Sequence, residues 1–240
     1  MNAPLLARGC FVTGTDTEVG KTKVGAALLH LLSANGERTA GCKPVAAGLA
    51  TIHGRRVNED VHALRAASTV ALTDAEVGPC QLEDACAPHI AAHRECRTID
   101  RRGLRRAVSD LARRADWLVV EGVGGFRVPL GADWDSADLA HDLGLPVVMV
   151  VGMRLGCLNH ALLTADAVGA CGLHLAGWVA NGIDAAMAHA DANIATLREH
   201  LPAPCLGVVP RLAHPTPAAV AAHLDVAAVR AAPRPCLFLE

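Results

Sequence analysis

Short apolar runs alternate along the chain with longer stretches that carry Ala and Leu at helical spacing. Runs such as WLVVE and PVVMVV are typical of central strands in a parallel sheet, because both faces of such strands are covered. The pattern predicts strands over residues 10–13, 39–43, 117–121, 147–151, 175–180 and 205–209. It predicts helices over residues 21–33, 58–67, 104–114, 158–170 and 185–200.

This alternation of strands and helices predicts an α/β fold with a doubly wound, mostly parallel sheet, as a single domain over residues 1–240. Residues 68–97 are less regular, and we interpret them as an insertion over the edge of the sheet. The Pro-rich residues 202–217 and the tail after Ala231 are interpreted as loops of the same domain.

Composition narrows the class of function. The 22 Lys and Arg residues against 24 Asp and Glu give a formal net charge of −2, without the cationic excess that a nucleic-acid binder needs. The aromatic content of 2% is too low for a base-stacking surface. Since no run reaches about 18 apolar residues, we expect no membrane span. Nine scattered cysteines without a CxxC pair favour thiols in a reducing cytoplasm.

The most informative segment is FVTGTDTEVGKTKVGAALLHLL, where an apolar strand passes through a loop into a helix. Backbone N–H groups of such a loop converge on a phosphate, Lys21 neutralises the phosphate oxygens, and the Thr22 hydroxyl can bind Mg²⁺. Five residues, instead of four, separate Gly14 from Gly20, so Thr15 stands where the usual motif has its first glycine. The segment predicts a nucleotide site in a sheet of the P-loop NTPase type.

Two acidic residues, Asp16 and Glu18, lie inside this loop. A carboxylate would repel a bound phosphate, so the presence of these acids needs a reason. We expect recognition of a cation or an amine near the phosphates.

Further candidate residues stand where strands end, because ligands of open α/β sheets bind beyond the carboxyl ends of the strands. Lys43, in GCKPVAAG, is one of three lysines among 22 cationic residues, which favours a compact point charge or an amine donor at this position over an ordinary surface lysine. Glu121 ends WLVV and is placed like a carboxylate that holds Mg²⁺. Asp60, in VNEDVHAL, is explained equally well by a helix that Asn58 caps.

Later strands are followed by two more polar groups. Residues 156–159 begin a predicted helix, whose unpaired N–H groups can hold a carboxylate. Asn181 ends HLAGWVAN, where its amide either pairs with a purine edge or merely stabilises a turn.

In content and order, the segments TGTDTEVGKT, CKPVAAG, VNEDVHAL, EGVGGFRVPL, RLGCLNHALLTA, GWVAN and GVVPRL resemble the dethiobiotin synthetases, from about Phe11 to Leu212. The resemblance implies an ATP-dependent ligase of biotin biosynthesis. Such an enzyme adds CO₂ to 7,8-diaminononanoate to form a carbamate and phosphorylates the carbamate with MgATP. It then closes the ureido ring to give dethiobiotin, ADP and phosphate. The resemblance also implies a homodimer with the active site at the subunit interface.

The resemblance assigns roles to individual residues. Lys21 and Lys43 are the implied catalytic residues, with Lys21 on the β- and γ-phosphates and Lys43 on the carbamate and the transferring phosphoryl group. The implied Mg²⁺ ligands are Thr22, Asp60 and Glu121. The implied substrate contacts are Lys43, Gly156, Cys157, Leu158 and Asn159. The implied nucleotide contacts are Glu18, Val19, Gly20, Lys21, Thr22, Lys23, Asp60, Glu121, Gly122, Val123, Gly124, Asn181, Gly182, Pro210, Arg211 and Leu212.

One position departs from the family pattern, since Ala47 stands where the synthetases usually carry Ser or Thr. Losing one hydrogen bond to a substrate costs about 0.5–1.5 kcal/mol. Three other functions stay open at this point: a regulatory P-loop ATPase, an amidoligase-type relative, and a synthetase that retains only nucleotide binding. The sequence does not decide between ATP, CTP and GTP.

Overall fold

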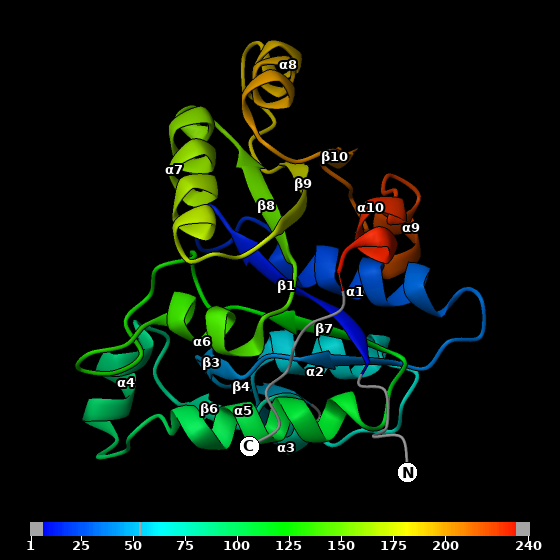
Figure 1. Ribbon diagram of the computed structural model, residues 1–240. Coiled ribbons are helices and arrows are strands. Elements are labelled where there is room, and N and C mark those ends of the chain that lie inside the picture. Colours follow the sequence, from blue (N-terminus) through cyan, green and yellow to red (C-terminus); the bar gives the residue numbers. More distant parts are fainter. Residues whose placement is uncertain (1–6, 53, 234–240) are drawn as a thin grey trace.

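A six-stranded sheet forms the centre of the structure, a computed structural model that describes residues 7–52 and 54–233. Its strands lie in the order β10-β9-β8-β1-β7-β2, and every neighbouring pair is parallel (Figure 1). The strands are β1 (Arg8–Gly14), β2 (Thr39–Cys42), β7 (Trp117–Glu121), β8 (Val147–Met153), β9 (Leu175–Gly182) and β10 (Cys205–Val209). All six predicted strands are present, and the predicted fold class is confirmed.

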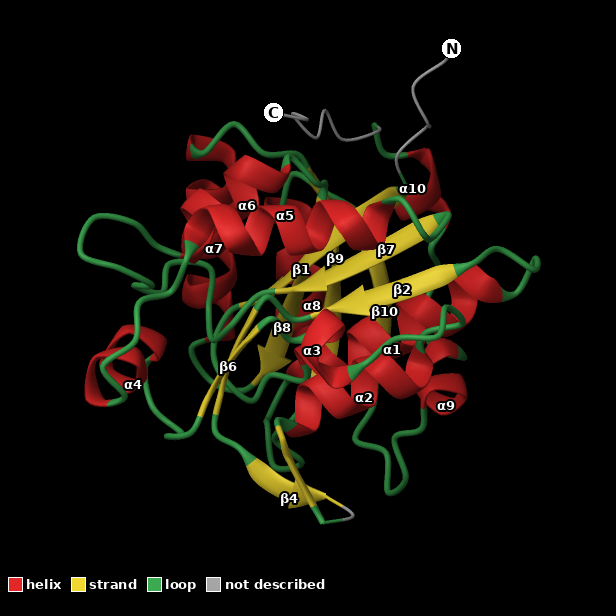
Figure 2. Ribbon diagram, turned by 90° about the horizontal axis from the view of Figure 1, so that it is seen from below, coloured by secondary structure: helices red, strands yellow, loops and turns green. Residues whose placement is uncertain are grey.

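The continuous apolar runs are buried on both faces, as expected of central parallel strands. Every residue of β7 and of β8 is buried. In β1, alternate residues enter two separate cores: Phe11 lies in one, while Cys10 and Val12 lie in the other. Helices cover both faces of the sheet (Figure 2).

One face is covered by α1 (Lys21–Ser33), α2 (Glu59–Ala67), α9 (Pro217–Ala221) and α10 (Ala227–Ala231). The other is covered by α5 (Arg101–Ala112), α6 (Ser136–Leu143), α7 (Cys157–Ala170) and α8 (Ala190–His200). The chain therefore winds in both directions from β1, which lies between β8 and β7. The carboxyl end of β1 is thus where the connections diverge, which is where such sheets bind ligands.

The irregular region 68–97 contains α3 (Asp74–Val77), β6 (Cys80–Leu82) and α4 (Pro88–Arg94). Strand β6 pairs with β3 (Val45–Ala47), which follows β2 at the edge of the main sheet. A small antiparallel pair, β4 (Ala50–Ile52) and β5 (Arg55–Val57), lies between β3 and α2 in the chain. This region is therefore built onto the β2 edge of the sheet.

Several predicted boundaries are wrong for local reasons. Helix α8 begins at Ala190 and not at residue 185, because Asp184 Oδ1 accepts the N–H of Ala186 in a turn and His189 has a φ of 57°. Helix α5 begins three residues early, since Asp100 caps it. Helix α6 was not predicted, and neither were α9 and α10, which occupy residues 217–231, between the Pro-rich stretch and the tail.

In the part of the chain that the structure describes, no helix is long and apolar enough to cross a membrane.

Candidate active site

The phosphate loop, residues 15–20, joins β1 to the start of α1. Gly20 has a φ of 95°, and a Cβ at this position would lie 2.3 Å from Nδ2 of Asn181, so only glycine fits. Glu18 also adopts a left-handed conformation, with a φ of 59°. The Lys21 side chain is buried, and its Nζ donates to the main-chain oxygen of Asp16 at 2.9 Å. The loop is therefore held in a tight turn around its own lysine.

The ammonium of Lys21 is unusually easy to deprotonate. Burial lowers its pKa from 10.5 to about 8, and the nearby Lys43 ammonium acts in the same direction, while the carboxylate of Glu121 opposes the shift. A bound anion would reverse this effect, because it stabilises the charged form of the lysine.

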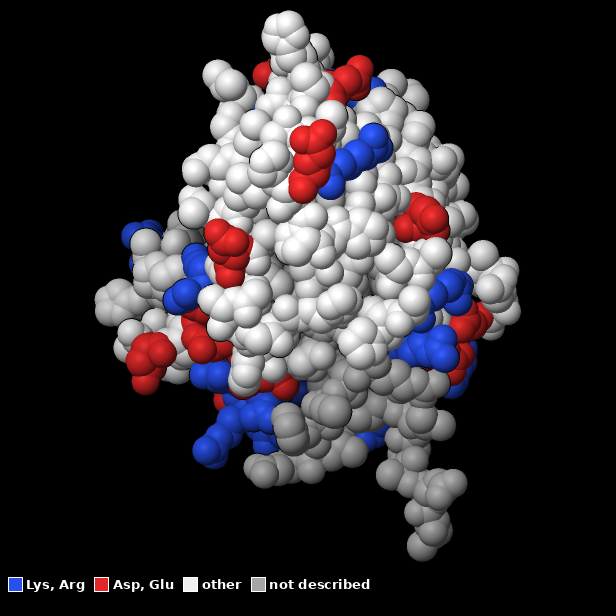
Figure 3. Space-filling model, turned by 45° about the horizontal axis from the view of Figure 1, so that its top comes forward, with Lys and Arg blue, Asp and Glu red and all other residues white. Residues whose placement is uncertain are grey.

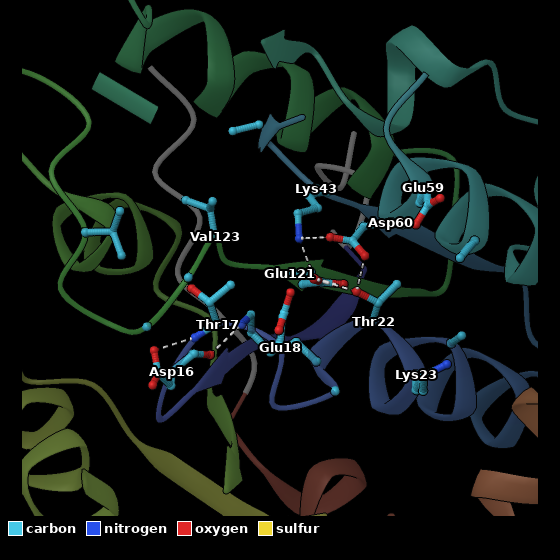
Figure 4. A pocket seen from close by; sticks show the side chains of 18 of the residues that line it. Asp16, Thr17, Glu18, Thr22, Lys23, Lys43, Glu59, Asp60, Glu121 and Val123 are labelled. Carbon is cyan, nitrogen blue, oxygen red and sulfur yellow. Dashed lines mark hydrogen bonds and ion pairs between the residues drawn. The ribbon is translucent and has the colours of Figure 1, made fainter. Parts of the chain in front are cut away.

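Four side chains from four different parts of the chain converge beside the loop (Figure 4). Lys43 follows β2, Asp60 lies in the first turn of α2, Glu121 ends β7 and Thr22 lies in the first turn of α1. The Nζ of Lys43 lies 2.6 Å from Asp60 Oδ2 and 2.6 Å from Glu121 Oε1. Oγ1 of Thr22 lies 2.7 Å from Asp60 Oδ1 and 2.9 Å from Glu121 Oε1. We refer to these four residues as the Lys43 cluster.

Burial and charge act against each other in this cluster. Burial alone would lower the pKa of Lys43, but the carboxylates of Glu121 and Asp60 outweigh burial and raise it. Burial opposes ionisation of Asp60, yet Lys43 outweighs burial and lowers the pKa of that carboxyl. Burial raises the pKa of Glu121, because Lys43 offsets only part of the desolvation. Lys43 is thus the permanent positive charge of the cluster.

The oxygen atoms of the cluster suit a divalent cation. The Thr22 hydroxyl has one proton but lies within hydrogen-bond distance of two carboxylates. Among the described residues, no donor reaches the second oxygen of Glu121, Oε2, which is buried. Carboxylate and hydroxyl oxygens are the ligands that Mg²⁺ prefers in proteins.

A cavity of about 1500 Å³ opens over the loop and the Lys43 cluster. A single drug-sized ligand occupies a pocket of roughly 300–1000 Å³, so the cavity has room for a nucleotide and a second small molecule. Its walls come from the phosphate loop, α1, the residues that follow β2, α2, the residues around the start of α4, and the end of β7 with the segment after it. They include Glu18, Gly20, Lys21, Thr22, Lys23, Lys43, Ala47, Asp60, Cys86, Pro88, Glu121, Val123, Gly124 and Arg127.

Known proteins are similar in sequence to this chain over almost its whole length. Residues 8–219 match the family model described as an AAA domain. The chain is 55% identical over 218 residues to the ATP-dependent dethiobiotin synthetase BioD of Ralstonia nicotianae, covering 91% of this chain and 95% of that protein. It is 54% identical to the protein of the same name from Aromatoleum aromaticum, covering 90% and 96%. The chain belongs to the ATP-dependent dethiobiotin synthetase family.

Solved structures support the fold. The septum site-determining protein MinD of Pyrococcus horikoshii, complexed with Mg-ADP, has a TM-score of 0.52 at 15% identity, covering 85% of this chain and 82% of that chain. The cell division ATPase MinD of Pyrococcus furiosus has a TM-score of 0.52 at 18% identity, covering 85% and 84%.

The sequence relatives confirm the resemblance to the synthetase family that the sequence indicates, and the chain is an ATP-dependent ligase.

Most residues that the synthetase resemblance assigns to phosphate and metal meet in the cavity, but the assigned base contacts do not line it. Asn181 and Val209 are in register at the ends of β9 and β10. The Asn181 amide donates to the main-chain oxygen of Val19 at 2.8 Å, behind the phosphate loop. Arg211 donates to the Ile183 carbonyl at 3.0 Å. Gly182 is the last residue of β9, and Pro210 and Leu212 lie in the segment after β10.

The residues assigned to the substrate carboxylate also lie outside the cavity lining of one chain. Gly156 precedes α7 with a φ of 95°, and Cys157 is buried. The N–H of Cys157 donates to the carbonyl of Arg154 at 3.0 Å, so it is already used within the turn. Leu158 and Asn159 complete the first turn of α7.

Sequence reasoning missed two parts of the synthetase cavity. The start of α4 and the residues before it, with Pro88 and Cys86, form a wall, although nothing in their local sequence marks them as functional. Val123 and Gly124 were assigned and line the cavity, whereas the assigned Gly122 does not; the neighbouring Arg127, which also lines it, was not assigned. Arg154 was missed as well, and the unexplained acid at position 16 was the signal that could have found it.

Proposed function

We propose that this chain forms dethiobiotin from 7,8-diaminononanoate, CO₂ and ATP. The observation that carries the proposal is the convergence of Lys43, Asp60, Glu121 and Thr22 beside Lys21, in one cavity large enough for a nucleotide and a diamine. The names of the relatives support the same reaction.

The chemistry asks the protein for charge and position more than for a nucleophile. One amine of the substrate adds to CO₂ and releases a proton, which leaves a carbamate anion. Transfer of a phosphoryl group to this anion gives a mixed anhydride and ADP. The second amine then attacks the carbonyl carbon, closes the ring and expels phosphate. Phosphoryl transfer is catalysed mainly by positioning and charge neutralisation.

Lys21 and Lys43 supply that neutralisation in our proposal. Lys21, enclosed by the loop, contacts the β- and γ-phosphates. Lys43 keeps its proton, because Glu121 and Asp60 raise its pKa, so it can stabilise the carbamate and the transferring phosphoryl group. Glu18, at the cavity wall, is available to a substrate amine.

Thr22, Asp60 and Glu121 are the proposed ligands of Mg²⁺, which the ATP substrate brings to the site. Two observations support this assignment: Oε2 of Glu121 is buried without a hydrogen-bond donor among the described residues, and the Thr22 hydroxyl lies between two carboxylates. When bound, the ion neutralises charge on the phosphate oxygens. It would also neutralise the two carboxylates, which would release the Lys43 ammonium to a substrate anion.

A second copy of the chain completes the site in our proposal. The start of α7, residues 156–159, does not line the cavity of its own chain. Leu155 beside it is 94% exposed, and Leu163 on α7 is 60% exposed. The side of the molecule that carries α7 and α8 shows few charged side chains (Figure 3). A homodimer would cover these leucines and bring the helix start to the partner's cavity, where it binds the substrate carboxylate.

The nucleotide base is proposed to lie at the ends of β9 and β10, beside Asn181, Gly182, Pro210, Arg211 and Leu212. These connections adjoin the phosphate loop through the bond from Asn181 to Val19. A cytoplasmic location is proposed on compositional grounds, because nine cysteines without a CxxC pair suit a reducing compartment.

Mass spectrometry tests the proposed reaction directly. The purified chain is incubated with 7,8-diaminononanoate, bicarbonate, Mg²⁺ and ATP, and dethiobiotin is sought. We expect ATP-dependent product from the native chain and from the control Arg102→Ala, an exposed position on α5, and none from Lys21→Ala. ATP hydrolysis without the diamine would instead indicate a switch ATPase. Nucleotide binding without either reaction would indicate a synthetase that has lost its activity.

A further inference from the structure

An ion pair joins the phosphate loop to the segment that leaves β8. The guanidinium Nη2 of Arg154 contacts Oδ2 of Asp16. The other carboxylate oxygen of Asp16 accepts the N–H of Thr17 at 2.7 Å, and its main-chain oxygen accepts Lys21 Nζ at 2.9 Å. Asp16 therefore contacts Arg154 through its side chain and Lys21 through its main-chain oxygen.

The end of β8 contacts the loop at further points. The N–H of Thr15 donates to the carbonyl of Val150 at 3.0 Å, and Thr15 Oγ1 lies 3.4 Å from the N–H of Gly152. A Cβ at Gly152 would lie 2.7 Å from Cγ1 of Val19, so the loop packs directly on this strand. Arg154 is the only charged side chain in β8 and the two residues that follow it.

We propose that Arg154 and Asp16 are a positioning pair, which fixes the phosphate loop in the conformation that binds ATP. Arg154 does not line the cavity, so its effect on the nucleotide must pass through Asp16. The pair also explains the acid in a phosphate-binding loop, because the guanidinium balances its charge. The carbonyl of Arg154 accepts the N–H of Cys157, so the same residue joins the loop to the start of α7.

Simple electrostatics and positioning predict opposite results for one of the two residues. If the side chains act only through their charges, Asp16→Asn removes a repulsive charge and tightens ATP binding, while Arg154→Gln weakens it. If they act as a positioning pair, both substitutions release the loop and both weaken binding. Asparagine keeps an oxygen for the N–H of Thr17, so Asp16→Asn removes the ion pair with little other change.

The test is the dissociation constant of MgATP, measured by isothermal titration calorimetry without diamine. We expect Asp16→Asn and Arg154→Gln each to weaken binding about 3- to 10-fold, and the double variant to bind no worse than the weaker single variant, since neighbours in one network are not additive. Arg154→Lys keeps the charge and should restore binding to within about twofold of the native chain.

A matched control comes from the amino ends of the strands, at the end of the sheet away from the phosphate loop. Arg38 forms a half-exposed ion pair with Asp116 where β2 and β7 begin, and Arg38→Gln should leave MgATP binding unchanged. Tighter binding by Asp16→Asn, unchanged binding by both single variants, or additive losses in the double variant would each overturn the proposal. The measurement needs no synthetase turnover, so a chain that makes no dethiobiotin would refute the proposed function and leave this test intact.

Discussion

Replacing Lys43 by methionine is the most direct test of the charge balance in the Lys43 cluster. Methionine has a similar length but no charge, so the change leaves space filled and removes the ammonium. Lys43 is 4% exposed, and both carboxylates that it contacts lie at 2.6 Å. Glu121 is fully enclosed, whereas Asp60 keeps access to solvent. The substitution therefore leaves the buried carboxylate of Glu121 without a compensating charge, whereas water can still solvate that of Asp60.

The size of the effect follows from the two ways in which Glu121 can respond. Breaking a buried ion pair by removing one partner costs about 3–5 kcal/mol of stability. The carboxyl can instead take up a proton, which at pH 7 costs about 1.4 kcal/mol for each unit above an unfolded pKa of about 4.3, or roughly 3.7 kcal/mol. Proton uptake thus limits the loss, and we expect Lys43→Met to lower the free energy of unfolding by about 3 kcal/mol at pH 7.

The sign of the pH dependence follows from the same carboxyl. Lys43 has a raised pKa, so its contribution is complete below about pH 10.4, where the unfolded lysine is also charged, and is lost above the folded pKa. In Lys43→Met, the pKa of Glu121 rises further, so the folded variant binds a proton that the unfolded chain does not. Its stability therefore increases as the pH falls from 7 toward 4.3. At pH 5, protonation of Glu121 costs only about 1 kcal/mol, so Lys43→Met can lower the free energy of unfolding by no more than about that amount.

Urea unfolding followed by circular dichroism at pH 7 and pH 5 measures both quantities. Adding Glu121→Gln to Lys43→Met removes the uncompensated negative charge and should recover most of the lost free energy of unfolding at pH 7. Lys23→Met, at an exposed position of α1, is the matched control and should change stability by less than about 0.5 kcal/mol. A Lys43→Met loss that is independent of pH, or a double variant less stable than Lys43→Met, would refute the assigned charge balance.

Three further predictions concern ligand binding. The pKa of Lys21 is about 8, so binding of MgATP to the free enzyme should weaken about tenfold from pH 7 to pH 9. Lys21→Arg should abolish this pH dependence, and an affinity of the native chain that does not change with pH would contradict the prediction. Ala47→Ser should lower the KM for the diamine in steady-state assays and leave kcat unchanged, because Ala47 lines the cavity and the new hydroxyl can bind the substrate; a large loss of kcat would show that the position has another role. Asn181→Ala should weaken ADP binding about 3- to 10-fold in calorimetry by releasing Val19, and an unchanged affinity would argue against any role in nucleotide binding.

The central sheet could be predicted from the sequence because its strands are covered on both faces. WLVVE and PVVMVV have to be apolar throughout, and such runs between helical stretches have few other interpretations. The pairing of β3 with β6 could not be predicted, since it joins two three-residue strands across 35 positions of the chain. Helix α6 was missed although Asp135 and Asp138 form a capping box, because eight residues give too little helical periodicity.

The Lys43 cluster could be predicted in outline for a topological reason. Lys43 and Glu121 end or follow neighbouring parallel strands, and the carboxyl ends of such strands lie at one edge of the sheet. Asp60 was ambiguous because its first-turn position suits a helix cap. The structure shows that it also contacts Lys43 and Thr22, so the side chain extends to the cluster while Asn58 makes the cap.

The conformation of the phosphate loop, in contrast, depends on residues far away in the chain. Asp16 contacts a residue 138 positions later and Val19 one 162 positions later. Arg154 follows β8 and Asn181 lies in β9, and both strands stand on the same side of β1. A sequence motif for the loop describes the groups that bind phosphate, but it does not contain the two side chains that hold the loop in place. The affinity for ATP should therefore respond to substitutions at both strand ends, which is why Arg154 and Asn181 are the residues to test beyond the motif.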